Sequence, residues 1–149
     1  MTGHRPTRHP RRGEHGSAAL EAAIGLPAFL LFIALLLFAG RVAIATQAVD
    51  SAAAQAARTA SIARTQTVAQ STAHAAATST LADQHVNCTR TTVRLDTRGF
   101  TAPVGQPATV TATVTCAVNL ADLAVPGIPG TRTVTATASS PLDTYRERR

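Results

Sequence analysis

The sequence has few aromatic residues and no tryptophan. Phe, Trp and Tyr make up 3% of its 149 residues. A chain of this length has room for one small domain. Without large aromatic side chains, the core of that domain must be built from Val, Leu, Ile and Ala, and we expect it to be thin and marginally stable.

The chain also lacks the pattern of a nucleic-acid-binding surface. Its net charge is +6, but Arg5, Arg8, Arg11 and Arg12 are concentrated in the N-terminal head. The other arginines are spread thinly with aspartates between them, and no basic stripe alternates with aromatic residues. We therefore expect no nucleic-acid partner.

Groupings typical of catalysis or metal binding are missing from the sequence as well. No nucleophile, base and carboxylate occur together, and no Gly-rich loop suited to phosphate is present. His74 and His85 show no ligand spacing to the two cysteines. The sequence predicts no enzyme, no cofactor and no metal site.

A long uncharged run is the most prominent feature that is present. Nineteen residues separate Glu21 from Arg41, and at about 1.5 Å per helical residue they cover most of a hydrocarbon core of roughly 30 Å. We predict a transmembrane helix over residues 17–41. The basic head, residues 1–16, places the N-terminus in the cytoplasm. Pro27 removes a backbone donor within the run and predicts a local kink.

Two plain interpretations of this run remain open. A secretory signal peptide could be cleaved near Ala43 and Ala45, although the run is longer than the roughly 7–15 residues of a typical signal and contains Glu21. A simple membrane anchor could tolerate Glu21 because this residue lies one turn into the run, away from the bilayer midplane.

A third interpretation uses the order of residues in "GSAALEAAIGLPAFLLFIALLLFAGR", residues 16–41. This stretch resembles the prepilin-type (class III) signal and, within that class, the TadE-like minor pseudopilins of tight-adherence (Tad) pilus systems. The resemblance implies that a prepilin peptidase cuts between Gly16 and Ser17 on the cytoplasmic side, which makes Glu21 the fifth residue. It also implies that the partners are other pilus subunits and Tad inner-membrane assembly proteins, besides membrane lipid.

Such cleavage would give Glu21 a physical role. It creates an α-amine on Ser17, and a carboxylate one helical turn further can pair with this amine in its own chain or in a neighbour. An unpaired Glu21 would be costly to bury, whereas a paired one would fix the register between helices.

The segment after the membrane run predicts a helix. Residues 42–86 are rich in Ala, and no Pro or Gly occurs from Arg41 to Gln84. We expect one continuous extracytoplasmic helix with a narrow face of small residues that can pack closely on another helix. An alternative is a weakly ordered stalk beyond Ala63. The face contains Val42, Ala45, Val49, Ala52, Ala56, Ala60 and Ala63.

The C-terminal part changes to an alternation of period two. Residues 107–120 place Val, Ala, Cys and Leu at even positions and Thr at opposing ones, and residues 90–96 and 131–138 alternate similarly. The connections "RGFTAPVGQP" and "VPGIPG" contain Gly and Pro. We predict a small antiparallel domain of three strands over residues 87–140, followed by a polar tail, 141–149. A helix must cover its apolar face, so the fold class is α+β and pilin-like.

Cys88 and Cys116 are the only cysteines. Outside the cytoplasm an even number favours a disulfide, which here would contribute roughly 3 kcal/mol. Cys116 lies on the expected buried face. Cys88 is out of phase with Val93 and Leu95, so we expect it to precede the strand or to sit at an irregularity. Two buried free thiols remain the alternative.

These features together predict a structural or assembly protein of a Tad-type pilus or a related secretion filament. The protein would span the cytoplasmic membrane once, with its C-terminal domain outside. One alternative is an uncleaved single-pass membrane protein whose outer domain binds a ligand or partner. Another is a secreted soluble domain.

Overall fold

The computed structural model describes residues 15–119 and 130–145, and the side chains from Leu20 onward within the first range. The chain divides into two compact units, one up to Leu36 and one from Leu37 on. Part of the predicted leader (residues 1–14), Leu120, most of the "VPGIPG" connection and the end of the tail (146–149) lie outside the described residues.

The first helix belongs to both units. Helix α1 (His15–Ser61) is 47 residues long and continues through Pro27 without a break. In the first unit its large apolar side chains are exposed, from 36% for Ile33 to 70% for Leu31. Within the described part of the chain, α1 is the one helix long and apolar enough to cross a membrane.

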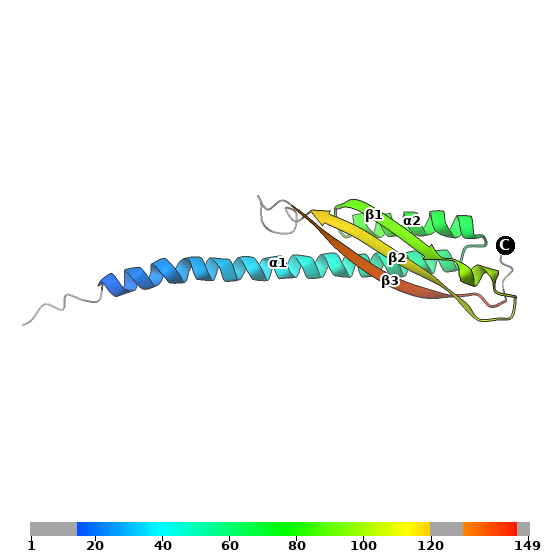
Figure 1. The fold of residues 1–149 in the computed structure, drawn as a ribbon, viewed down its shortest axis with the longest axis horizontal. Coiled ribbons are helices and arrows are strands. Elements are labelled where there is room, and N and C mark those ends of the chain that lie inside the picture. Colours follow the sequence, from blue (N-terminus) through cyan, green and yellow to red (C-terminus); the bar gives the residue numbers. More distant parts are fainter. Residues whose placement is uncertain (1–14, 120–129, 146–149) are drawn as a thin grey trace, which may run out of the picture. The chain divides into compact units, whose positions relative to one another are not determined.

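In the second unit the Ala-rich segment forms two helices where one continuous helix was predicted. Helix α1 ends at Ser61, and α2 (Gln66–Asp83) begins after a turn in which Thr65 accepts a hydrogen bond from the backbone N–H of Val68 (3.2 Å). The chain folds back, so α2 lies beside the end of α1 (Figure 1). The expected single helix was wrong because burial of a second Ala face outweighs helical continuity at Ile62–Thr65.

Three strands form an antiparallel meander in the order β1-β2-β3 (Figure 1). Strand β1 covers Cys88–Asp96, β2 Ala108–Asn119 and β3 Thr131–Leu142, with a short 3-10 helix η1 (Arg98–Thr101) after β1. The predicted alternation is confirmed, since every even position of β2 from Val110 to Val118 is buried. Strand β3 continues beyond the predicted strand, residues 131–138, and past the expected domain boundary at 140, and Leu142 is buried.

The core lies between the inner face of the sheet and the two helices. Ala dominates the helical side, so the backbones can approach closely, and Val dominates the sheet. Phe100 of η1 is the one buried aromatic residue among those described. The helical core residues are Ala45, Ala48, Val49, Ala52, Ala53, Ala56, Ala57 and Ala60 of α1 and Ala69, Ala73, Ala77 and Leu81 of α2.

The outer face of the sheet carries a ladder of hydroxyl groups. Side-chain hydrogen bonds link β2 to β3 at Thr111–Ser139 (2.8 Å), Thr113–Thr137 (3.1 Å) and Thr115–Thr135 (3.2 Å). Because such cross-strand pairs stabilise a sheet without apolar burial, threonine can hold the register on the face that the helices leave open.

Candidate functional site

The predicted processing site lies at the start of α1. Gly16 and Ser17 fall in the first turn of the helix, which begins at His15. Glu21 follows Ser17 by four residues, so the Ser17 backbone and Glu21 lie one turn apart on the same side of the helix. The helix thus has the spacing that a pairing between a Ser17 amine and the Glu21 carboxylate requires.

Glu21 is exposed in the isolated chain, as are the apolar residues around it. Leu20 is 65% and Ile24 66% exposed, and the Glu21 carboxylate forms no ion pair with any residue that the structure describes. A carboxylate within an uncovered apolar helix is stable only at an interface or opposite a partner group. This surface is therefore suited to contact with lipid and other helices.

Pro27 lies six residues beyond Glu21 on the same apolar helix. It removes one backbone donor from the helical ladder. The nearby Gly25 has open space around it, with no atom within 4 Å of the position that a Cβ would take. This stretch can accept a close neighbour without a clash, while the predicted kink at Pro27 stays a prediction.

The two cysteines form the expected disulfide between β1 and β2. Cys88 and Cys116 are bonded, with 5.4 Å between their Cα atoms. The strand register shifts between Cys88 and Arg90, and the extra residue, Thr89, donates its hydroxyl hydrogen bond to the Ala117 carbonyl (2.9 Å). This β-bulge reverses the side-chain alternation, which explains how Cys88 reaches the buried Cys116 despite its sequence phase.

An exposed ion pair closes the turn after β1. The Asp96 carboxylate accepts hydrogen bonds from the backbone N–H (3.1 Å) and Nε (2.9 Å) of Arg98, and also from its terminal NH₂ group. These hydrogen bonds lower the pKa of Asp96 from 3.8 to about 2 and raise the pKa of Arg98. The pair is a local turn element, since no other titratable side chain takes part in the described contacts.

Fold and site together define a pilin-like α+β protein in which the described residues contain one N-terminal apolar helix suited to single-pass membrane anchoring. Residues 16–58 match the family model of TadE-like protein. The match confirms the family that the N-terminal residues resemble. No curated protein and no solved structure matches the chain.

The match begins at Gly16 and includes Glu21, Pro27 and the whole apolar run. TadE-like proteins are structural components related to the Tad pilus and are not known as enzymes. The match over residues 16–58 supports a component associated with a Tad pilus, and such an association implies contact with other pilus components. The folded part beyond residue 58 lies outside the match.

Proposed function

We propose that this protein is a TadE-like minor pseudopilin that is processed after Gly16 and serves in the assembly or structure of a Tad-type pilus or related secretion filament. The observation that carries the proposal is the family match over residues 16–58, which begins at the proposed cleavage site. The N-terminus would be cytoplasmic and the disulfide-bonded domain would lie outside the membrane.

The exposed apolar surface of α1 supports this proposal. Lipid can cover it before assembly, and neighbouring helices can cover it within a filament. The partners would be a prepilin peptidase, other pilus subunits and Tad inner-membrane assembly proteins. Glu21 would pair with the Ser17 amine of its own chain or of a neighbour, in which case loss of the carboxylate weakens subunit association while membrane insertion is retained.

We expect Glu21→Ala to reduce association with other pilus subunits roughly tenfold, since a polar contact between membrane helices is worth about 1–2 kcal/mol. The measurement is co-purification of tagged Tad subunits from membranes at matched expression levels. Leu20→Ala serves as the control, because it removes a side chain of similar exposure at the same depth but no charge.

Equal loss of partners in both variants would show that bulk, not the carboxylate, matters. Unchanged recovery with Glu21→Ala would leave Glu21 as a tolerated interfacial residue of a simple anchor. Cleavage and insertion should be normal in both variants, and each can be checked on the same membranes by the mass of the chain.

A further inference from the structure

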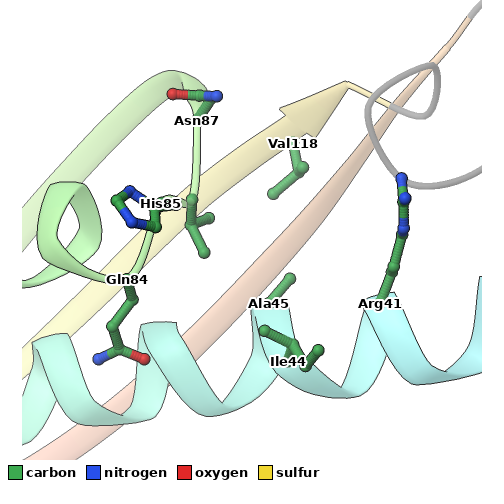
Figure 2. Close-up of a pocket in the computed structure, with 8 residues that line it drawn as sticks. Arg41, Ile44, Ala45, Gln84, His85, Asn87 and Val118 are labelled. Atoms are coloured by element: carbon green, nitrogen blue, oxygen red, sulfur yellow. The ribbon is translucent and has the colours of Figure 1, made fainter.

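Within the second unit, helix α1 has one side that the sheet and α2 leave uncovered. Ala45 is 4% exposed and projects from α1 toward Val118 of β2, whereas the neighbouring Ile44 is 62% exposed (Figure 2). The same division into a buried and an exposed side continues along α1 as far as residue 58. The exposed side includes Ala43, Thr46, Gln47, Asp50, Ala54 and Arg58. A partner that reaches this side must lie alongside the helix.

Two opposite charges stand on this exposed side. Neither the Asp50 carboxylate nor the Arg58 guanidinium forms an ion pair or a hydrogen bond with any residue that the structure describes. Arg58 follows Asp50 by eight residues, which is about 12 Å along the helix axis. The two side chains are too far apart to pair with each other, since pairs within a helix join residues three or four apart. Both charges are therefore open to a neighbouring molecule.

The surface around the two charges consists of small side chains. Ala54 lies midway, four residues from each charge, and Ala43 and Thr46 precede Asp50 on the same side. The Thr46 hydroxyl donates a hydrogen bond to the Val42 carbonyl (2.9 Å), so it needs no partner from outside. Small side chains allow the backbones of two helices to approach closely. The surface therefore suits contact with another helix.

Membrane anchoring restricts the register that two parallel copies of α1 can take. Copies anchored at the same depth hold each residue at the same height, so Asp50 would face Asp50 and Arg58 would face Arg58, which is unfavourable. A displacement of eight residues, about 12 Å along the axis, instead brings Arg58 of one copy level with Asp50 of its neighbour. Packed helices lie roughly 8–10 Å apart, a distance that the two side chains can bridge. The charges thus favour a staggered parallel pair.

We propose that this side of α1 is a contact surface for a second copy of the chain, displaced by about 12 Å along the helix axis, with Arg58 of one copy paired to Asp50 of the next. Each copy uses Asp50 toward one neighbour and Arg58 toward the other, so the contact is head-to-tail. Because the displacement prevents closure into a ring, repetition of this contact gives an open helical array. The inference rests on the proposed function, since a filament is the setting in which copies become displaced along their axes.

The test is disulfide cross-linking between two differently tagged full-length copies that are produced together in cells assembling the Tad filament. One copy carries Thr46→Cys and the other Ala54→Cys, two exposed positions apart from the native Cys88–Cys116 bond. The displaced pairing brings residues 46 and 54 of different copies to the same height and predicts a link between them. Pairing without displacement predicts a link between two copies that both carry Ala54→Cys. Absence of the first link, or a larger yield of the second, overturns the proposal.

Charge reversal in the cross-linking pair tests the ion pair itself. Asp50→Arg places two cations at each displaced contact and Arg58→Asp places two anions there. We expect either change, made in both copies, to lower the cross-linked fraction roughly fivefold, the factor expected of one exposed ion pair. The double variant restores opposite charges and should recover the original fraction, which damage to folding would not allow. Arg64→Asp is the control, because Arg64 is exposed beyond the end of α1.

Single variants that cross-link as fully as the unreversed pair would overturn the pairing of Asp50 with Arg58. A link to a chain of a different mass would assign the surface to another subunit and overturn the assignment to a second copy. The N-terminal mass of the same preparations reports processing after Gly16 separately. Chains that start at Ser17 but give no link contradict this inference alone, whereas chains that start at Met1 contradict the proposed function.

Discussion

At the scale of single residues, Gly99 shows how closely the small core is packed at its far end. It lies in η1, next to the buried Phe100. A Cβ built on Gly99 would clash with the Thr109 carbonyl oxygen, much closer than van der Waals contact allows, and would lie 2.9 Å from Leu142 Cδ1. The carbonyl belongs to the backbone of β2, so it cannot move aside as a flexible side chain could. The missing side chain allows η1 to pack directly on the sheet.

We therefore expect Gly99→Ala to destabilise the domain by about 1–3 kcal/mol, the usual cost of overpacking. Thermal unfolding in detergent, followed by circular dichroism, measures the change. Gly40→Ala is the matched control because its Cβ meets nothing within 4 Å, and alanine favours helix. A Gly99→Ala protein as stable as the Gly40→Ala protein would contradict the close approach of η1 to β2.

At the scale of elements, the helix pair was the part of the fold that the sequence did not predict. The strands could be predicted because alternation of period two places Val110, Val114 and Cys116 on one face without further information. The break after Ser61 has no Gly or Pro, and its only local signal is Thr65, a residue that also occurs inside helices. The turn depends on tertiary burial of α2, which local propensity does not report.

The helix pair predicts a sharp difference between two alanines of α2. Ala73 is fully buried, whereas Ala75 is exposed two residues away. Ala73→Leu should lower the free energy of unfolding by about 1–3 kcal/mol because the core has no space for the larger side chain. Ala75→Leu should change it by less than about 0.5 kcal/mol. Chemical denaturation of both variants measures the difference, and equal effects would mean that α2 does not pack as described.

The disulfide is the second element-scale feature, and its pairing was predictable because only two cysteines exist. The geometry of the disulfide was harder to predict, because the bulge at Thr89 that turns Cys88 inward arises from the pairing of β1 with β2. The bond closes a separation of 28 residues. On the loop-entropy estimate it stabilises the domain by about 3 kcal/mol, a large share for a core of Ala and Val.

We expect alkylation without reductant to label neither cysteine of the membrane-extracted protein, and mass spectrometry to find one cross-linked peptide pair. Cys116→Ser should destabilise the domain more than Cys88→Ser. Both remove the link, but Cys116 is fully buried, so its replacement also places a hydroxyl in the apolar core. Full labelling of both cysteines in the native protein would refute the bond and weaken the extracytoplasmic placement.

At the scale of the whole molecule, the two units differ in whether their apolar side chains are exposed or buried. Residues 20–36 expose Leu, Ile and Phe along a helix, and this surface needs lipid or other helices. The unit from Leu37 on contains a buried apolar core of its own, formed by its helices and its sheet. From the uncharged run and the later alternation, we expected a membrane segment up to residue 41 and a folded part after it.

The first residue of the mature protein tests the central claim most directly. A TadE-like pseudopilin processed after Gly16 starts at Ser17, and its net side-chain charge falls from +6 to 10 − 7 = +3 because Arg5, Arg8, Arg11, Arg12 and Glu14 are lost. Intact-mass spectrometry or N-terminal sequencing of the protein purified from its native membranes should find a chain that starts at Ser17. A protein that starts at Met1 or Thr2 would contradict processing and support a plain anchor, and one that starts at Thr46 would indicate cleavage of a secretory signal.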